Sequence, residues 1–212
     1  MPGLFVSFEG GEACGKSTQV ARLVRKLETK GYRVLSIREP GSTRAGEVIR
    51  SLLLNPGQGI DLTPAAELLL FGASRAQLVE EVIRPAFNAG KVVLADRFND
   101  STTVYQGIAR GLGLKFILEM EEFICGDLRP ALTFLLDLDL ETMRNRVLRR
   151  VRPVSGPDRM EELPLEFHRK VREGYLQLAR EFPQRIKVID AARSPDEVEA
   201  AIWKEIDAIL GR

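Results

Sequence analysis

The stretch Gly10-Gly11-Glu12-Ala13-Cys14-Gly15-Lys16-Ser17-Thr18 decides the fold of this 212-residue chain. It fits the pattern G-x-x-x-x-G-K-[ST], a glycine-rich loop whose backbone N–H groups surround the phosphates of a nucleotide. An apolar run from Leu4 to Phe8 precedes the stretch, and a helical pattern of apolar residues follows it and ends at Gly31. Strand, loop and helix therefore come in the order that places phosphates at a helix N-terminus.

Residues 10–18, called the phosphate loop below, are expected to bind ATP. Within them, Lys16 is expected to reach the β- and γ-phosphates, and the Ser17 hydroxyl is expected to ligate Mg²⁺. The alternative is a glycine-rich turn that matches the pattern by chance. The strand before the loop and the helix after it argue against that alternative.

The composition limits the classes of partner. The chain has 31 lysine and arginine residues against 30 aspartate and glutamate residues, so no overall field attracts it to nucleic acid or membrane. No signal peptide is visible, and no apolar run approaches the roughly 20 residues of a membrane-spanning helix. The two cysteines, Cys14 and Cys125, lack metal-ligand spacing and argue against a disulfide framework. We expect a cytoplasmic protein in which Cys14 is a small residue that the phosphate loop tolerates. If its thiol is exposed, it would be sensitive to alkylation.

Apolar segments separated by helical patterns indicate the α/β class. Five segments are expected to be strands: 4–8, 33–38, 91–95, 132–137 and 186–190. Alternation of strands with helices favours a parallel sheet with right-handed crossovers. The expected architecture is a P-loop NTPase-like three-layer sandwich, in which a five-stranded parallel sheet is flanked by helices, and residues 1–212 form a single kinase domain.

Two later segments have their own signals. Ser194 is a candidate N-cap with Pro195 at the first helical position, and a stripe of apolar residues follows with helical spacing. Residues 152–158 contain two prolines and a glycine that interrupt a basic helical region. Because this interruption splits a charged region and joins no two cores, we expect a mobile lid at about 146–160.

The third expected strand ends in Asp96-Arg97. An acid at the carboxyl end of a parallel strand lies where ligands of open α/β sheets bind, so Asp96 is a candidate Mg²⁺ ligand with Ser17. The alternative is that Asp96 caps the next helix. An arginine beside the metal site needs an anionic partner, and Arg97 therefore implies a second anion site.

Other segments offer the rest of such a site. Arg38-Glu39-Pro40-Gly41 follows the second strand, Arg50 follows on a helix, and Phe71 and Arg75 share one helical face. The segment 101–107 adds hydroxyl, phenol and amide groups. Taken singly, these side chains could be core or surface residues. Together they offer an aromatic face and hydrogen-bonding groups suited to a nucleotide acceptor.

Read together, these segments resemble the thymidylate kinase (dTMP kinase) family over essentially the whole chain. The matching pieces are the phosphate loop, Arg-Glu-Pro-Gly at 38–41, Leu-Phe-x-x-x-Arg at 70–75, Asp-Arg-Phe-x-x-Ser-Thr-x-x-Tyr-Gln-Gly at 96–107, and Asp-Arg-Met-Glu at 158–161. The resemblance implies transfer of the ATP γ-phosphoryl group to dTMP, which gives dTDP and ADP for dTTP synthesis. It also implies Mg²⁺ as cofactor and a homodimer formed through helix packing.

The same resemblance implies roles for the acceptor site. Phe71 would stack on thymine and Arg75 would hydrogen-bond the base. Ser101, Tyr105 and Gln106 would complete the base and sugar pocket, with Tyr105 crowding a ribose 2′-hydroxyl.

The phosphate end of the acceptor has implied partners too. Arg50 and Arg97 would hold the monophosphate. Glu12 would lie near the sugar hydroxyl or a metal-bound water, and Glu39 would lie close to the same corner. The chain departs from the family pattern at a few positions, which are Ser42, Ser74, Leu78 and Ala192.

The charge of the reactants defines what the site must supply. A phosphate monoester has a second pKa of about 6, so the acceptor is largely a dianion at neutral pH and needs no general base. Two like unit charges about 4 Å apart repel by roughly 4 kcal/mol at an effective dielectric of about 20. Lys16, Mg²⁺ and Arg97 offset part of this repulsion.

The lid is expected to supply the remaining positive charge. Some members of the family carry an arginine inside the phosphate loop, where this chain has Glu12, Ala13 and Cys14. Arg150 and Arg159 are the candidate catalytic arginines of the lid, and Arg146 is expected to stack on adenine. The alternative is a solvated basic helix face.

Two rival functions remain open. One is a nucleotide kinase with another acceptor, which the residues around Phe71 and Gln106 disfavour. The other is a nucleotide-dependent switch, which would need Asn-Lys-x-Asp and Asp-x-x-Gly motifs that this sequence lacks.

Overall fold

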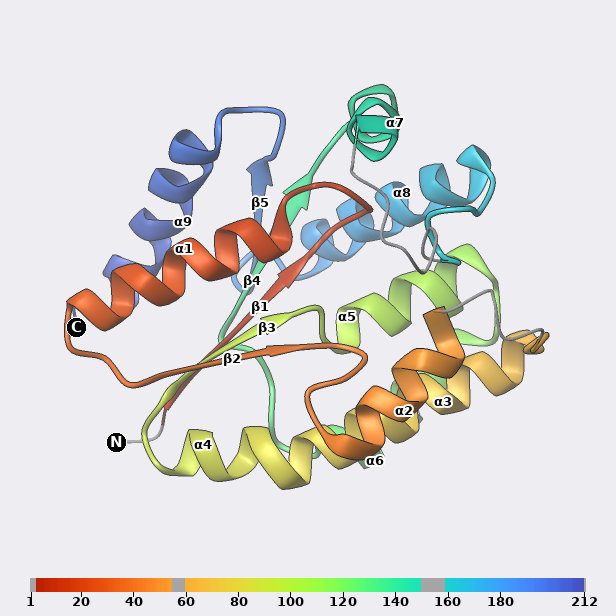
Figure 1. The fold of residues 1–212 in the computed structure, drawn as a ribbon, viewed down its shortest axis with the longest axis horizontal. Coiled ribbons are helices and arrows are strands. Elements are labelled where there is room, and N and C mark those ends of the chain that lie inside the picture. The colour runs from red at the N-terminus through yellow and green to blue at the C-terminus, as the bar shows by residue number, and fades with distance from the viewer. Residues whose placement is uncertain (1–2, 55–59, 150–158, 212) are drawn as a thin grey trace.

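A computed structural model describes residues 3–54, 60–149 and 159–211. Five parallel strands form its central sheet in the order β2-β3-β1-β4-β5 (Figure 1). The strands are β1 Leu4–Glu9, β2 Val34–Arg38, β3 Val92–Asp96, β4 Leu132–Asp137 and β5 Ile186–Asp190. All five expected strands are confirmed, with bounds that differ from the expected ones by at most one residue.

Helices connect these strands. They are α1 Lys16–Thr29, α2 Arg44–Leu54, α3 Pro64–Leu78, α4 Arg84–Asn88, α5 Asn99–Thr102, α6 Leu114–Cys125, α7 Leu140–Arg149, α8 Leu165–Glu181 and α9 Pro195–Leu210. Two π-helical segments, η2 Val79–Ile83 and η3 Thr103–Ala109, continue α3 and α5. Arg150 and most of the expected lid lie outside the described residues.

Alternation along β1 shows how the layers form. Val6 and Phe8 belong to a core cluster with residues of α1 and α9, whereas Phe5 packs with residues of η2 and α4 on the opposite face. A third cluster joins η3 and α8 over β4 and β5. Figure 1 shows α1 and α9 on one side of the sheet and α4 on the other. The fold is thus the expected three-layer, P-loop NTPase-like sandwich.

The C-terminal helix confirms the local signals of its sequence. Ser194 caps α9 by accepting a hydrogen bond from the Glu197 backbone, and the Glu197 side chain accepts one from the Ser194 backbone in return. Val198, Ile202 and Ile206 are buried against the core.

The sheet also brings two carboxyl ends together at the site. Phe8 of β1 pairs with Asp96 of β3, so the phosphate loop leaves β1 directly beside the Asp96 carboxylate.

No helix among the described residues is long and apolar enough to span a bilayer.

Candidate active site

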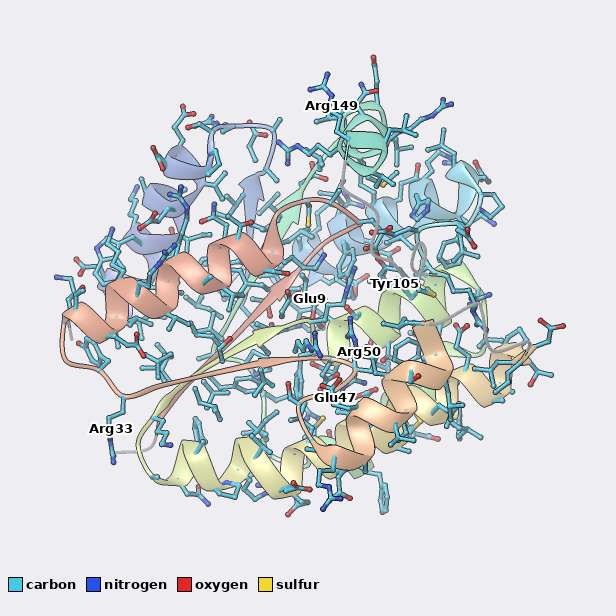
Figure 2. All side chains as sticks on the ribbon, viewed as in Figure 1. Glu9, Arg33, Glu47, Arg50, Tyr105 and Arg149 are labelled. Carbon is cyan, nitrogen blue, oxygen red and sulfur yellow. The ribbon has the colours of Figure 1, made fainter. Side chains whose placement is uncertain are left out.

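A cavity of about 280 Å³ opens at the carboxyl ends of the strands. Figure 2 shows Glu9, Arg50 and Tyr105 near this end of the sheet, whereas Arg33 lies at the opposite end. The cavity is lined by residues 12–18 of the phosphate loop and by Arg38, Glu39, Pro40, Arg50, Leu54, Phe71, Arg75, Asp96, Arg97, Ser101, Thr102, Tyr105, Gln106, Met160 and Glu161. Every residue expected at the acceptor site therefore reaches one cavity, together with the loop expected to hold ATP.

Backbone geometry shapes the phosphate loop. Gly10 has a φ of +136°, and a Cβ atom there would lie 2.5 Å from the Leu136 carbonyl oxygen. Gly15, at φ +95°, is the N-cap of α1 and provides no side-chain cap. Ala13 also has a positive φ, of 54°. The first N–H groups of α1 are thereby left facing the cavity, as an anion site requires.

Lys16 folds back onto its own loop. Its Nζ donates to the carbonyl oxygens of Gly11, at 2.8 Å, and Gly10, at 3.3 Å, and lies 3.5 Å from the Cys14 sulfur. Cys14 is 3% exposed, so its thiol is not open to alkylation in this arrangement. The loop wraps the sulfur against Gly10 and the core, which its short side chain allows.

Ser17 and Asp96 form a pair of oxygen ligands. The Ser17 hydroxyl donates to the Asp96 carboxylate at 2.5 Å, across the junction of β1, α1 and β3. Mg²⁺ prefers oxygen ligands, keeps several waters and is usually bound by one or two protein groups together with phosphates. The two residues fit such a site.

Glu12 and Arg97 form an ion pair above this junction. Arg97 Nη2 donates to Glu12 at 2.7 Å, and the Tyr105 hydroxyl donates to the same carboxylate oxygen at 3.0 Å. Burial would raise the pKa of Glu12, but Arg97, Lys16 and Tyr105 outweigh it and lower the pKa to about 2. Glu12 is thus ionised at every physiological pH and can accept a hydrogen bond from a hydroxyl or a metal-bound water.

Arg75, which the family resemblance expects to hydrogen-bond the thymine base, is almost completely buried. It is 2% exposed and lies between the carboxylates of Glu39 and Glu121, with further bonds to Thr102 and to the Phe98 carbonyl oxygen. All three of its nitrogens therefore already have protein acceptors. Any donation to a base has to be shared with these partners.

The Glu39 carboxyl, which pairs with Arg75, has a raised pKa because it is buried as well. Desolvation raises its pKa to about 7 in spite of the nearby Arg75 guanidinium. Its Oε1 is buried and has no hydrogen-bond partner among the described residues. Since Glu39 lines the cavity, this oxygen is a polar group left for a ligand or a water.

The residues at the border of the cavity differ in what they contact. Arg146 of α7 donates to the carbonyl oxygens of Ala191, at 2.9 Å, and Ala13, at 3.5 Å, and so bridges the loop after β5 and the phosphate loop. The Arg159 side chain pairs with Glu67 of α3, and its backbone N–H donates to Leu54. Neither arginine lines the cavity in this arrangement.

Sequence reasoning missed several buried groups behind the lining. Glu121 accepts a hydrogen bond from Arg75, and the Tyr175 hydroxyl lies 3.5 Å from Arg97. Glu9 accepts hydrogen bonds from Ser101 and Tyr175, and Glu67 accepts them from Gln106, Arg110 and Arg159. An acid at the end of a fully buried strand was the available signal for Glu9. His168, the single histidine, is buried on α8 and does not line the cavity.

Comparisons with known proteins agree with this geometry. The family model described as thymidylate kinase matches residues 8–202. The chain belongs to the thymidylate kinase family. Members of this family use ATP to phosphorylate dTMP to dTDP and generally need a divalent metal, and the chain is accordingly an ATP-dependent kinase.

Relatives cover the chain almost completely. A thymidylate kinase from Syntrophotalea carbinolica is 50% identical over 201 residues, which are 94% of this chain and 93% of the relative. One from Deinococcus radiodurans is 47% identical over 204 residues, 96% of each chain. The crystal structure of thymidylate kinase from Ehrlichia chaffeensis superposes with a TM-score of 0.76 at 29% identity, covering 97% of this chain and 99% of that one.

Proposed function

We propose that this cavity carries out the family reaction, with dTMP as acceptor and dTDP for dTTP synthesis as product. The observation that supports this most is the convergence of the phosphate loop with Phe71, Arg97 and Gln106 on one cavity. A donor site and an aromatic, arginine-lined acceptor site thus share one opening, as direct transfer between two nucleotides requires.

On the donor side, residues 10–18 hold the ATP phosphates and Lys16 exchanges the loop carbonyls for phosphate oxygens. Ser17 and Asp96 would hold Mg²⁺, which when bound would neutralise charge that develops on the transferred group. Arg146 lies against the phosphate loop and the loop after β5, where it can cover the adenine ring.

On the acceptor side, Phe71 stacks on the base, while Arg75, Ser101, Tyr105 and Gln106 complete the pocket. The amide nitrogen of Gln106 donates to Glu67 at 3.2 Å, which fixes the orientation of the amide.

The phosphate of the acceptor meets the opposite end of the pocket. Arg50 and Arg97 hold the monophosphate, and Glu12 and Glu39 lie close to the sugar and metal corner. Arg50 Nη1 donates to the Pro40 carbonyl oxygen at 2.7 Å, so its position is tied to the loop that carries Glu39.

The lid supplies the charge that the phosphate loop lacks. Arg150 and Arg159 are assigned to the transferring phosphoryl group, Arg150 from outside the described residues. Arg159 has to exchange Glu67 for the phosphates during transfer. Movement of the lid at about 146–160 supplies that exchange.

We further propose that the enzyme is a cytoplasmic homodimer. Both cysteines are free thiols, as is usual in reducing compartments. Phe116 and Phe123 lie seven residues apart on α6 and are 52% and 89% exposed, and Leu69 on the neighbouring α3 is 55% exposed. A second copy that covers this face would bury them. Sedimentation of the wild-type chain and of Phe123→Glu tests this, and a wild-type monomer at micromolar concentration contradicts it.

The decisive experiment for the function is a panel of acceptors. Rates with ATP and Mg²⁺ are measured for dTMP, dUMP, UMP and AMP, with ADP and phosphorylated acceptor followed separately. The proposal expects dTMP to be preferred and the ribonucleotides to be poor. Preference for another acceptor would support a different nucleotide kinase, and ATP hydrolysis with no acceptor phosphorylated would support a switch.

A further inference from the structure

Glu9 is a buried acid that the reaction outlined above does not use. It ends β1, one residue before the phosphate loop, and is fully buried. Its carboxylate accepts three hydrogen bonds, from the Phe98 backbone N–H at 2.7 Å, the Ser101 hydroxyl at 2.6 Å and the Tyr175 hydroxyl at 2.8 Å. A buried acid with three donors is costly to assemble, so its surroundings indicate its purpose.

All three donors adjoin Arg97. Its Nη1 lies 3.3 Å from the Ser101 hydroxyl and 3.5 Å from the Tyr175 hydroxyl, and Phe98 is the next residue in the chain. Nη2 is directed to Glu12 on the cavity side. The guanidinium therefore has one edge against the Glu9 network and the other edge toward the site.

The backbone of Arg97 needs this support. Its φ is +73°, in the left-handed region that non-glycine residues rarely adopt. Such a conformation persists when neighbouring contacts fix it from both sides. Here the Arg97 N–H donates to the Phe8 carbonyl oxygen at 3.0 Å, and Glu9 holds the Phe98 N–H that follows.

We propose that Glu9, acting through Ser101, Tyr175 and the Phe98 backbone, is a positioning residue that aims Arg97 at the phosphate of the acceptor. The inference rests on the proposed role of Arg97 in holding dTMP. Glu9 itself touches neither substrate. It fixes the direction of the Ser101 and Tyr175 hydroxyl hydrogens, and it fixes the backbone at Phe98, which follows Arg97.

Hydrogen-bond direction explains why an acid is needed at this position. When Glu9 is ionised, Ser101 and Tyr175 both donate to it and both present lone pairs to Arg97. When Glu9 is protonated, its own O–H donates to one of the hydroxyls, which then has to turn its hydrogen elsewhere. The ionised form is therefore the one that aligns Arg97.

The charged groups around Glu9 set when it ionises. Asp100 of α5 and Glu39 after β2 oppose its ionisation, whereas Arg97 after β3 and Arg185 before β5 favour it. Burial, reinforced by Asp100, raises the pKa of Glu9 to about 7. Alignment of Arg97 should accordingly improve as the pH rises through neutrality.

Four variants test the proposal: Glu9→Gln, Tyr175→Phe, Arg97→Ala and the double variant Glu9→Gln/Arg97→Ala. Glutamine keeps the acceptor for Phe98 but resembles the protonated acid. We expect Glu9→Gln to raise the KM for dTMP about tenfold and Tyr175→Phe to raise it about threefold, with the KM for ATP within about twofold. In the Arg97→Ala background, Glu9→Gln should add less than about twofold.

A matched control lies on the same strand and face. Ser7 bonds the Thr133 hydroxyl at 2.7 Å, so Ser7→Ala removes a buried hydrogen bond from β1 away from Arg97. It should lower the melting temperature and leave the KM for dTMP unchanged. The ratio of KM values between Glu9→Gln and wild type should grow from pH 6 to pH 8, since both enzymes meet the same titrating dTMP.

The results separate two failures. If Arg97→Ala leaves the KM for dTMP unchanged, the proposed role of Arg97 is wrong and the inference falls with it. If Arg97→Ala raises that KM but Glu9→Gln and Tyr175→Phe do not, the inference alone is wrong. Additive effects in the double variant, or equal losses for ATP and dTMP, also overturn it. If Glu9→Gln does not fold, Tyr175→Phe, which keeps the aromatic ring, decides the outcome.

Discussion

The phosphate loop and the wall that faces it hold charge in different ways. The loop relies on backbone N–H groups and on Lys16, which rests on the carbonyl oxygens of its own loop. The facing wall, called the acceptor wall here, consists of Glu39, Arg75, Arg97 and Glu121. Its Arg75 is bonded to two buried carboxylates, and its Arg97 is bonded to Glu12.

This difference separates a site that rearranges from one that is built in advance. Lys16 can exchange weak carbonyl contacts for phosphates at little cost. Arg75 cannot leave its partners without stranding charge in the interior. We therefore expect changes in the loop to affect turnover and changes in the acceptor wall to affect stability as well as binding.

The largest effect should come from breaking the acceptor wall. Arg75→Met leaves Glu39 and Glu121 buried without their cation and should lower the free energy of unfolding by about 3–5 kcal/mol. Lys16→Met should lower it by less than about 1 kcal/mol, because its loop partners are neutral carbonyls. Urea denaturation measures both. Equal losses in the two variants would remove the distinction between the two regions.

The second largest effect should come from removing a lid arginine, because the lid arginines are proposed to supply positive charge that the phosphate loop lacks. Arg150→Ala or Arg159→Ala should lower kcat by about 10²–10³-fold with little change in nucleotide affinity, the usual result of losing one transition-state donor. Steady-state kinetics and a nucleotide-binding titration measure the two quantities. Unchanged turnover in both variants would show that the lid arginines do not act on the phosphoryl group.

The third effect uses pH to separate the regions. Glu39 has a pKa raised to about 7, so the stability it contributes is fully present below its unfolded pKa of about 4.5 and is lost as pH rises through 7. Glu12, lowered to about 2, contributes stability that is present above 4.5 and lost only as pH falls toward 2. Between pH 5 and pH 8, the free energy of unfolding of Glu39→Gln should therefore fall by about 2–3 kcal/mol less than that of wild type, as urea denaturation at the two pH values measures.

Glu12→Gln provides the contrast for that measurement. It should leave the change in unfolding free energy between pH 5 and pH 8 as in wild type. If the wild-type chain loses no more unfolding free energy between pH 5 and pH 8 than Glu39→Gln does, the raised pKa of Glu39 is contradicted.

The smallest effect should be confined to the base. Phe71→Ala should raise the KM for dTMP about tenfold and change the KM for ATP little, because stacking of a base on an aromatic ring contributes about 1–3 kcal/mol. Phe182→Ala, which removes an exposed aromatic at the end of α8, serves as the control. A larger effect on ATP than on dTMP would mean that the base pocket has been assigned to the wrong nucleotide.

Features encoded by neighbouring residues could be predicted from the sequence. The order of strand, glycine loop and helix predicted the phosphate loop, and the Ser194-Pro195 pair predicted the start of α9. The nine residues that the family resemblance assigns to the acceptor site come from short segments typical of that family. All nine line the cavity, and their binding roles stay predictions.

Features that depend on distant partners could not be predicted. Tyr175 and Glu9 lie 166 positions apart, and Glu121 reaches Arg75 from a helix with no site motif of its own. Arg159 has the right type and position for a lid arginine, yet its pairing with Glu67 depends on how α3 packs. Burial of Cys14 likewise follows from how the loop closes over the core, which its sequence does not record.

The two buried thiols allow local opening of the structure to be measured by thiol labelling. Cys14 belongs to the phosphate loop and its side chain is buried against the core, whereas Cys125 is fully buried at the end of α6 and burial raises its pKa to about 12. A thiol reagent can reach Cys14 when the loop opens locally and Cys125 when the packing of α6 is lost. Labelling kinetics thus follow two different motions in one unmodified sample, and nucleotide binding should slow the first much more than the second.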